Sequence, residues 1–213
     1  MIMAFTAESA TSRQDIVRTA TLLLGERGYQ GMSMRLLAQE LGMSAPSLYH
    51  HFPSKGALLF AVLEDNQKDF LGGMASAVAS AGADPVRQLG ALVQAHVRFQ
   101  IEKIEYARVY DRTFLGMGPL VEALSDQQRN LMRGLQRQHT ENVRRILRSG
   151  AACGVMTVDD VAVTAFAIIS LCDGVIGWYR AAGRLGIEEI AQRYADLALK
   201  LAGAQASSAA NLR

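Results

Sequence analysis

The residues best suited to chemistry lie in one stretch, SMRLLAQELGMSAPSLYHHF, between Ser33 and Phe52. Short or hydrogen-bonding side chains fill its second half, namely Ser44, Ala45, Pro46, Ser47, Tyr49 and His50. Short side chains near a helix N-terminus let a helix enter a DNA major groove, and hydroxyl and imidazole groups hydrogen-bond base edges and phosphates. The pattern indicates nucleic-acid contact rather than catalysis.

Two short helices with a tight corner would position these side chains. Ser33 and Ser44 are good N-caps for the first and second helix. Gly42 offers the positive φ that ends the first helix. Leu48 and Phe52, four residues apart, give the second helix its inner face. The stretch therefore predicts a helix-turn-helix.

Two cations flank this unit. Arg35 would approach DNA from the start of the first helix, where its paired donors suit a guanine edge. Lys55 follows the cap residue Ser54, and a cation beside free backbone N–H groups suits a phosphate. The helix that begins at Lys55 contains Gly72-Gly73, which we expect to interrupt it as a helix end, a close contact or a flexible joint.

The segment GYQGMSMRLLAQELGMSAPSLYHHFPSKGALL resembles the DNA-binding domain of the TetR family of transcriptional regulators. The family pattern is present as Ala38, Gly42, Leu48-Tyr49, Phe52 and Ser54-Lys55, within a resemblance that covers roughly residues 12 to 65. One departure is Gly56, where the family commonly has an acidic residue, and we expect this glycine to loosen the next helix start. The alternative, an amphipathic hairpin without a nucleic-acid partner, is disfavoured because corner, caps and outward residues agree.

The amino-acid composition limits the possible fold classes. The chain has 213 residues, half of them hydrophobic, with only 4 prolines, which predicts an all-α protein. With the resemblance, it predicts a three-helix helix-turn-helix domain at residues 12–71 and a larger helical ligand-binding and dimerisation domain at residues 72–203. The net charge of +2 does not point to DNA by itself. Cys153 and Cys172 form no CxxC pair and no secretion signal is evident, so we expect a cytoplasmic protein.

No catalytic or metal-binding motif emerges. The histidines His50, His51, His96 and His139 form no HExxH pair, and neither a glycine-rich phosphate loop nor a nucleophile elbow is present. His96, on an apolar helix, reads as a satisfied core histidine. We expect no cofactor, no metal and no enzyme activity, and a helical enzyme is the alternative that turnover in a substrate screen would revive.

Residues 158–180 are apolar almost all round, as in a membrane span. Asp173, Thr164 and Ser170 lie inside this run and make lipid exposure costly. A helix covered on one side by its own domain and on the other by a partner accounts better for the run, so we expect no membrane contact.

The last predicted helix, residues 187–201, carries apolar residues three and four apart, including Ile190, Tyr194, Leu197 and Leu201. Two such helices from each subunit would form a four-helix interface, as the family resemblance implies. We therefore expect a homodimer on an inverted-repeat, double-stranded DNA operator. A monomer that covers these residues internally is the alternative.

The resemblance also implies a small-molecule cavity whose occupancy changes the spacing of the two DNA-reading helices. Candidate lining residues are large and apolar or aromatic, and ordinary core packing is the alternative for each of them: Phe99, Tyr106, Tyr110, Phe114, Met117, Phe166 and Trp178.

The stretch GVIGWYRAAGRLGIEEIAQRYADLALKLAG is similar to the end of TetR-type regulators of fatty-acid, steroid or related acyl-CoA metabolism. That implies a hydrophobic or acyl-CoA effector, with Arg98 or Arg180 as partners for anionic groups. The sequence thus predicts a ligand-responsive repressor, and a DNA-binding dimer without an effector is the alternative.

Overall fold

The computed structural model of the chain describes residues 12–115 and 122–204, and all regular structure in these ranges is helical. The all-α prediction is confirmed. In chain order the helices are α1 (Arg13–Gly31), α2 (Met34–Glu40), α3 (Ala45–His51), α4 (Lys55–Ser80), α5 (Pro85–Glu102), α6 (Ile104–Tyr110), the π-helical turn η1 (Asp111–Leu115), α7 (Asp126–Ala152), α8 (Val161–Asp173), α9 (Val175–Trp178) and α10 (Ile187–Leu201).

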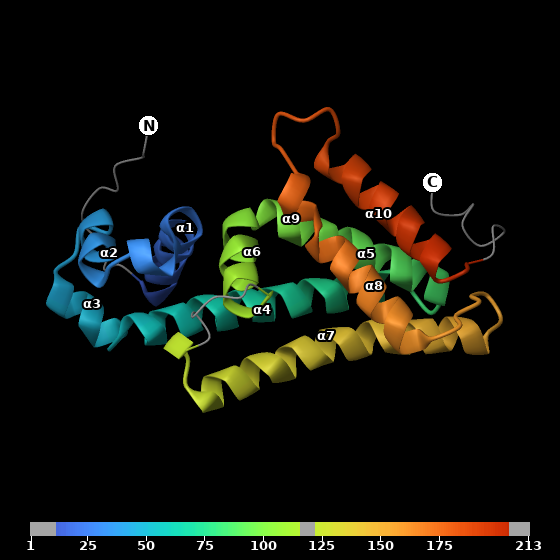
Figure 1. Ribbon diagram of the computed structural model, residues 1–213, viewed down its shortest axis with the longest axis horizontal. Coiled ribbons are helices and arrows are strands. Elements are labelled where there is room, and N and C mark those ends of the chain that lie inside the picture. Colours follow the sequence, from blue (N-terminus) through green and yellow to red (C-terminus); the bar gives the residue numbers. More distant parts are fainter. Residues whose placement is uncertain (1–11, 116–121, 205–213) are drawn as a thin grey trace.

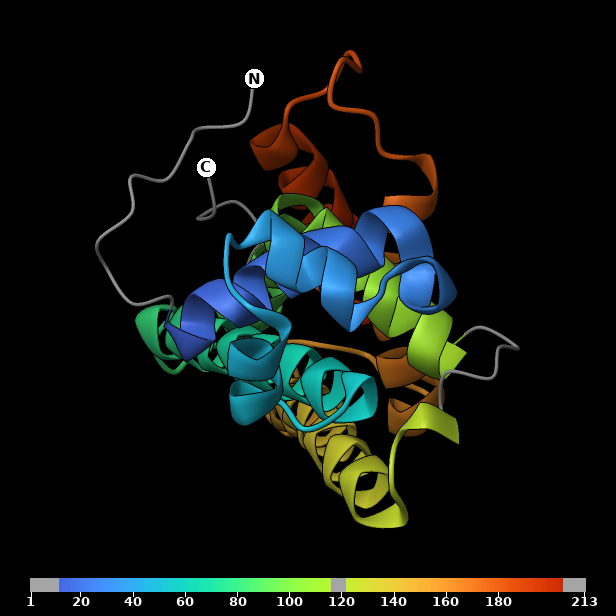
Figure 2. The same ribbon diagram turned by 90° about the vertical axis from the view of Figure 1, so that its left-hand side faces the viewer.

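The long helix α4 organises the molecule. Figure 1 shows α1, α2 and α3 gathered at one end of α4, with α5 over its other half, α8 and α10 beyond that end, and α7 below. Figure 2 views the molecule from the first end, so that α1 to α3 and the start of α4 lie in front. The chain therefore separates a small N-terminal unit from a larger helical body.

Two hydrophobic cores correspond to these parts, and α4 contributes to both. Leu58 to Leu63 pack in the N-terminal core with α1, α2 and α3, whereas Phe70, Leu71 and Met74 pack in the C-terminal core with α5, α7, α8 and α10. Tyr106 and Val109 of α6 belong to the N-terminal core although they follow α5. Helix α7 also contributes to both cores, with Met132 in the first and Val143 and Ile146 in the second, so α4 and α7 connect the two parts.

Local signals place the first helices. Ser12 caps α1 in a reciprocal capping box with Asp15, and α1 kinks at Gly28, which has a φ of 70°. The helix therefore bends at Gly28 and continues for one more turn to Gly31. Gly42 has a φ of 64°, the left-handed conformation expected at the corner after α2.

Two glycines behave differently from expectation. The predicted interruption at Gly72-Gly73 is wrong, because α4 continues to Ser80 and a Cβ on either glycine would meet nothing within 4 Å. The helix-end and close-contact interpretations therefore fail. At Gly56 a Cβ would lie 2.6 Å from the Ala123 carbonyl oxygen. Because Gly56 has no side chain, the segment before α7 can pack against the start of α4. The departure from the family pattern therefore has a packing reason.

The apolar run before α10 divides into α8 and α9. The window Val161–Trp178 has a mean hydropathy of 1.9 and satisfies the length and composition of a membrane span, but a single such helix is weak evidence for one. Ala165, Ile168 and Cys172 are buried in the C-terminal core, while Val163 and Phe166 are exposed. The protomer thus covers one side of this run and leaves the other side open.

Candidate functional site

The helix α3 presents its polar side to solvent. Leu48 is fully buried and anchors the helix, whereas Ser47, Tyr49 and His50 are exposed. The Ser44 hydroxyl accepts a hydrogen bond of 3.3 Å from the Ser47 backbone N–H, which fixes the start of the helix. The short helix therefore offers its exposed hydroxyl and imidazole groups to an approaching surface.

The flanking candidates lie beside α3. Ser33 caps α2 by accepting a 3.1 Å hydrogen bond from the Leu36 N–H, which makes its hydroxyl part of the fold. Arg35, two residues after Ser33, is exposed and, in the described part of the chain, makes no ion pair. Ala45 and Pro46 form the first turn of α3 after the Ser44 cap, so their small side chains leave the helix start open.

Lys55 is not a freely solvated lysine. It begins α4 directly after the cap residue Ser54, whose hydroxyl accepts from the Ala57 N–H at 3.0 Å. Its Nζ lies 4.2 Å from the centre of the Tyr29 ring, and burial lowers the pKa of the amine. The aromatic ring holds this cation near the helix N-terminus, a suitable arrangement for a phosphate.

The four residues predicted at the dimer interface are divided by the structure. Leu197 and Leu201 are exposed on α10, whereas Ile190 and Tyr194 are buried inside the protomer against α5 and α8. The prediction for Ile190 and Tyr194 is therefore corrected: a residue 2% exposed, as Ile190 is, has no surface left for a partner.

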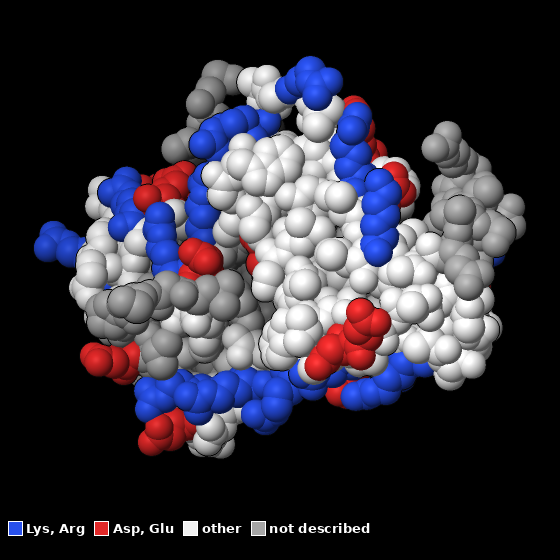
Figure 3. All heavy atoms as spheres, turned by 45° about the vertical axis from the view of Figure 1, so that its right-hand side comes forward, with Lys and Arg blue, Asp and Glu red and all other residues white. Residues whose placement is uncertain are grey.

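An exposed apolar surface, here termed the α8–α10 face, is formed by Val163, Phe166, Leu197 and Leu201. Figure 3, which brings the right-hand side of Figure 1 forward, shows a broad area without charged side chains, bordered by Lys and Arg side chains above and by both acidic and basic side chains below. Exposed apolar side chains gathered in this way mark an interaction surface. The face lies on the helices that the sequence assigned to dimerisation.

A cavity of about 310 Å³ lies in the helical body between α4, α5, α6, α7 and α8. Five of the predicted aromatic residues line it, namely Phe99, Tyr106, Tyr110, Phe114 and Phe166. Trp178 does not: it lies on the surface, stacks on Tyr194 and donates a 2.9 Å hydrogen bond to the tyrosine hydroxyl. Met117 lies outside the described residues.

The cavity wall is aromatic and its floor is polar. Phe70 packs edge-on against His96 and His139, with ring centres 4.8 Å apart in each case. His96 Nε2 lies 3.0 Å from Asp173 Oδ1, and the Gln100 amide donates to the same oxygen at 2.7 Å. Contacts between different helices thus hold the polar groups of His96, Gln100 and Asp173 next to the aromatic rings.

The floor carries one internal charge pair. Burial alone would lower the pKa of His96, but its contacts with Cys172 and Asp173 outweigh burial and raise that pKa to about 10. Burial would likewise raise the pKa of Asp173, yet the hydrogen bond and charge of His96 lower it. Burial, together with the cationic His96, lowers the pKa of His139 to about 3. At neutral pH the floor holds a His96–Asp173 ion pair and a neutral His139.

The two arginines that the sequence suggested as partners for anionic groups do not line this cavity. Arg98 binds Glu188 through hydrogen bonds of 2.6 to 2.9 Å, and Arg180 donates to the Tyr179 carbonyl on the surface. Sequence reasoning missed the polar liners Gln67, Gln100, Gln136, His139, Thr140 and Asp173. The available signal was Asp173 in an apolar run together with two histidines on otherwise apolar helix faces.

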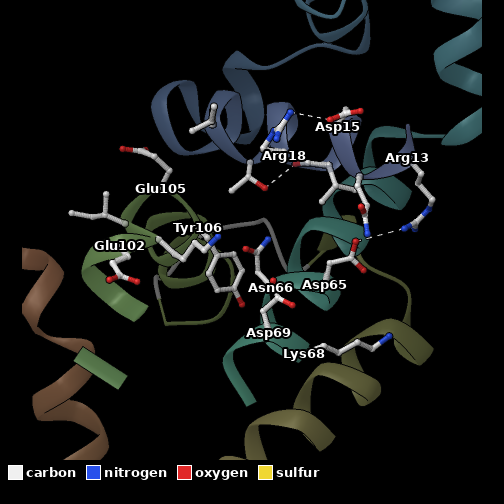
Figure 4. A pocket seen from close by; sticks show the side chains of 16 residues that line it. Arg13, Asp15, Arg18, Asp65, Asn66, Lys68, Asp69, Glu102, Glu105 and Tyr106 are labelled. Atoms are coloured by element: carbon white, nitrogen blue, oxygen red, sulfur yellow. Dashed lines mark hydrogen bonds and ion pairs between the residues drawn. The ribbon is translucent and has the colours of Figure 1, made fainter. Parts of the chain in front are cut away.

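A larger cleft of about 880 Å³ separates the two parts of the molecule near α1. Figure 4 shows Asp65, Asn66 and Asp69 of α4 across from Glu102 and Glu105 at the corner between α5 and α6, with α1 above. Arg13 lies 3.6 Å from Asp65 and its guanidinium stands over the Phe52 ring. This open, charged cleft suits water and ion pairs rather than a compact apolar ligand.

Beside this cleft, α6 is the close contact between α1 and the body. A Cβ on Gly25 would lie 2.7 Å from the Glu105 Cβ and 2.9 Å from the Glu105 Cα, so only glycine fits there. The Arg112 guanidinium donates to the Gly25 carbonyl at 3.4 Å. Because Tyr106 and Tyr110 of the same helix line the cavity, one short helix touches both the cavity and α1.

Comparisons with known proteins agree with this architecture. Residues 16–62 match the family described as bacterial regulatory proteins of the tetR family. Residues 82–202, which is 121 of 213 residues, match the tetracyclin repressor-like C-terminal domain.

Individual relatives extend over most of the chain. The HTH-type transcriptional repressor KstR2 of Mycolicibacterium smegmatis is 27% identical over 206 residues, 92% of each chain. The solved structure of the TetR family regulator PfmR from Thermus thermophilus is 34% identical, has a TM-score of 0.74, and covers 90% of this chain and 97% of its own.

At 23% identity and a TM-score of 0.76, AibR in complex with isovaleryl coenzyme A and operator DNA shares the fold over 91% of this chain and 99% of its own. The two family matches and the 34% identical relative carry the assignment. The chain belongs to the TetR family and is a DNA-binding transcriptional regulator, not an enzyme.

Proposed function

We propose that this protein is a homodimeric cytoplasmic repressor that binds an inverted-repeat operator and is released by a small effector. The effector is hydrophobic, or carries its hydrophobic part as an acyl-CoA. The observation that carries the proposal is the exposed polar side of α3, where Ser47, Tyr49 and His50 project beside a buried Leu48. Such a helix in the major groove reads base edges while its flanks hold phosphates.

Arg35 and Lys55 have different tasks in this proposal. Arg35 reads a base, because its guanidinium is exposed and free to present two parallel donors to a guanine. Lys55, held over Tyr29 at the start of α4, together with Tyr49 fixes the register on the phosphates. Small side chains at the N-terminal ends of α2 and α3 let these helices approach the DNA closely. They belong to Ser33, Ser44, Ala45 and Pro46.

Dimerisation through the α8–α10 face supplies the symmetry. Leu197 and Leu201, which are exposed on the single protomer, pack against the same residues of a second copy. A two-fold axis there presents two α3 helices to one side of the duplex. Their half-sites then lie about 34–36 Å apart, or a multiple of that distance.

Effector binding reaches the DNA-reading unit through α6. An effector in contact with Tyr106 and Tyr110 acts on the helix whose opposite side packs on Gly25 of α1. A ligand shifts the DNA-binding equilibrium only by its differential affinity for the two states. A DNA-binding dimer without an effector is the alternative, and unchanged operator affinity across a compound panel would favour it.

Selection from a randomised duplex library tests the proposal. The purified protein should enrich an inverted repeat at moderate salt, and a folded dimer that enriches no sequence would refute the regulator model. On the selected operator, Arg35→Ala should lose about 1–3 kcal/mol of preference over random DNA. Lys55→Ala should weaken both DNAs alike and reduce the salt slope by about one. Arg148→Ala, in α7, is the matched control and should change neither.

A further inference from the structure

The cavity floor contains a histidine without partners. His139 is buried, and within the described part of the chain neither of its ring nitrogens has a hydrogen-bond partner. Its ring is fixed by the edges of Phe70 and His96, at 4.8 Å and 5.0 Å between centres. A buried polar group left unpaired costs about 1–3 kcal/mol, so its retention at a cavity wall points to a ligand.

The other polar liners are largely occupied. Tyr106 donates to Gln67 at 3.1 Å, and the Gln136 amide donates to the Tyr110 hydroxyl at 2.6 Å. The Thr140 hydroxyl donates to the Gln136 carbonyl at 3.2 Å. His139 therefore stands out among the cavity-lining side chains as the group with both polar atoms available.

The charges of the cavity exclude an anionic group. Among the described residues that line it there is no Lys or Arg, and its charges are those of His96 and Asp173, which pair with each other at 3.0 Å. A carboxylate or phosphate on the effector would meet the Asp173 carboxylate. Arg144, which does not line the cavity, stands on the Phe166 ring at 5.3 Å and lies 3.9 Å from Glu141, so its charge already faces a carboxylate. The effector group at the floor is consequently uncharged.

The size of the cavity sets the size of the ligand. About 310 Å³ is the lower end of the roughly 300–1,000 Å³ typical of ligand sites. It corresponds to about ten liquid waters at ~30 Å³ each. One or two rings fill such a space, and a coenzyme with its phosphates does not.

We propose that the effector is a compact, uncharged molecule of one or two rings whose hydroxyl group hydrogen-bonds His139. A neutral imidazole has one N–H donor and one acceptor nitrogen, and a hydroxyl can serve either. The aromatic wall then covers the ring body. This inference rests on the proposed function for its regulatory meaning, because it names the ligand of the same cavity.

Four matched probes test the polar group on the wild-type protein by calorimetric titration without DNA. These are 5-indanol, 5-methoxyindane, indane and indane-5-carboxylate, with isovaleryl coenzyme A as a fifth. We expect 5-indanol to bind about tenfold or more tighter than indane and 5-methoxyindane, because only the alcohol can donate as well as accept. The carboxylate and the coenzyme A thioester should bind more weakly than 5-indanol.

Variants then locate the contact. His139→Phe keeps a ring in place and removes both nitrogens, so 5-indanol should lose its advantage and bind within about twofold of indane. This variant removes an unpaired buried group and should fold well. His51→Phe, an exposed histidine on α3, is the matched control and should leave all five affinities unchanged.

Each other outcome overturns the inference. If 5-indanol and indane bind with equal affinity, no polar group of the protein anchors the ligand. If 5-methoxyindane binds as tightly as 5-indanol, the ligand does not need a hydroxyl donor. Tighter binding of the carboxylate or thioester shows an anion site. Binding of no probe by a preparation that still binds its selected operator refutes the ligand class alone, whereas the DNA-binding part of the proposed function fails only in the DNA selection.

Discussion

The DNA-reading end and the effector cavity are built in opposite ways. The first takes its geometry from neighbours in sequence, since Ser33, Gly42 and Ser44 cap or end helices within a dozen residues of one another. The cavity takes its floor from residues far apart, such as His96 and Asp173, which are 77 positions apart in the chain. The same protein thus combines a locally specified surface with an assembled interior.

The two regions also treat polar groups differently. On α3 the hydroxyl and imidazole groups are exposed, and water satisfies them until DNA replaces it. In the cavity, His96 and His139 are buried, so their pairing depends on the surrounding helices. Substitutions at the DNA-reading end should therefore change binding with little effect on stability, whereas substitutions in the body should change stability or assembly first.

The largest expected effect breaks the assembly and leaves the DNA-reading end intact. Leu197→Glu puts a carboxylate into the proposed dimer interface, where burial of an unpaired charge costs several kcal/mol. We expect a monomer by light scattering at low micromolar concentration, with native helicity, and operator affinity reduced about 100-fold or more. Leu131, on α7, is 45% exposed like Leu197, so Leu131→Glu is the matched control and should stay dimeric. A dimeric Leu197→Glu would remove α10 from the interface.

The next effect separates the two histidines of the cavity by pH. His96 has a folded pKa raised to about 10, so its contribution to stability is full below its unfolded pKa of about 6.5 and is lost as the pH rises towards 10. His139 has a folded pKa lowered to about 3, so its neutral form contributes stability above about pH 6.5, which is lost as the pH falls towards 3.

Urea unfolding across this pH range measures both limbs. In wild type the free energy of unfolding should fall between pH 6.5 and 3, and His139→Phe should remove about 2–4 kcal/mol of that fall. The decrease in the free energy of unfolding at alkaline pH should remain in this variant. His96→Gln should abolish the alkaline decline and lower stability at neutral pH, because Asp173 loses its cation. An unchanged acid limb in His139→Phe would contradict the neutral assignment of this histidine.

A smaller effect tests the contact that joins the two regions. Gly25→Ala places a Cβ against the backbone and side chain of Glu105, and overpacking of this kind costs about 1–3 kcal/mol. We expect a lower free energy of unfolding and a weaker effect of effector on operator affinity, measured on one preparation. Gly31→Ala, six residues further along the same helix, meets only the Arg27 side chain at 3.2 Å and is the control. Unaltered coupling in a destabilised Gly25→Ala would show that α6 does not carry the signal.

The smallest effect has the opposite sign. Gly72→Ala and Gly73→Ala add a Cβ in open space on a continuous helix, so each should stabilise the protein by about 1 kcal/mol. If the pair acts as a joint, the double variant should also bind operator with an altered response to effector. A stabilised protein with an unchanged response would make these glycines ordinary exposed helix positions.

The sequence by itself determined the helical class, the caps of α2 to α4, the corner at Gly42 and the exposed side of α3. These features depend on hydrogen bonds and dihedral angles within a few residues, and side-chain type reports them directly. The five aromatic cavity residues could be named only as a group of large side chains, and Trp178 was wrongly included because apolar character does not tell a cavity wall from a surface.

Tertiary structure alone decided which side of each apolar helix faces the core. Ile190 and Leu197 lie on one periodic pattern, yet α5 and α8 cover the first and leave the second exposed. It also decided that His96 pairs with Asp173 while His139 stays unpaired, and that Gly25 and Gly56 accept Glu105 and Ala123. Periodicity along one helix specifies an apolar stripe, but the neighbour that buries it and the charge that reaches it come from segments brought together only by folding.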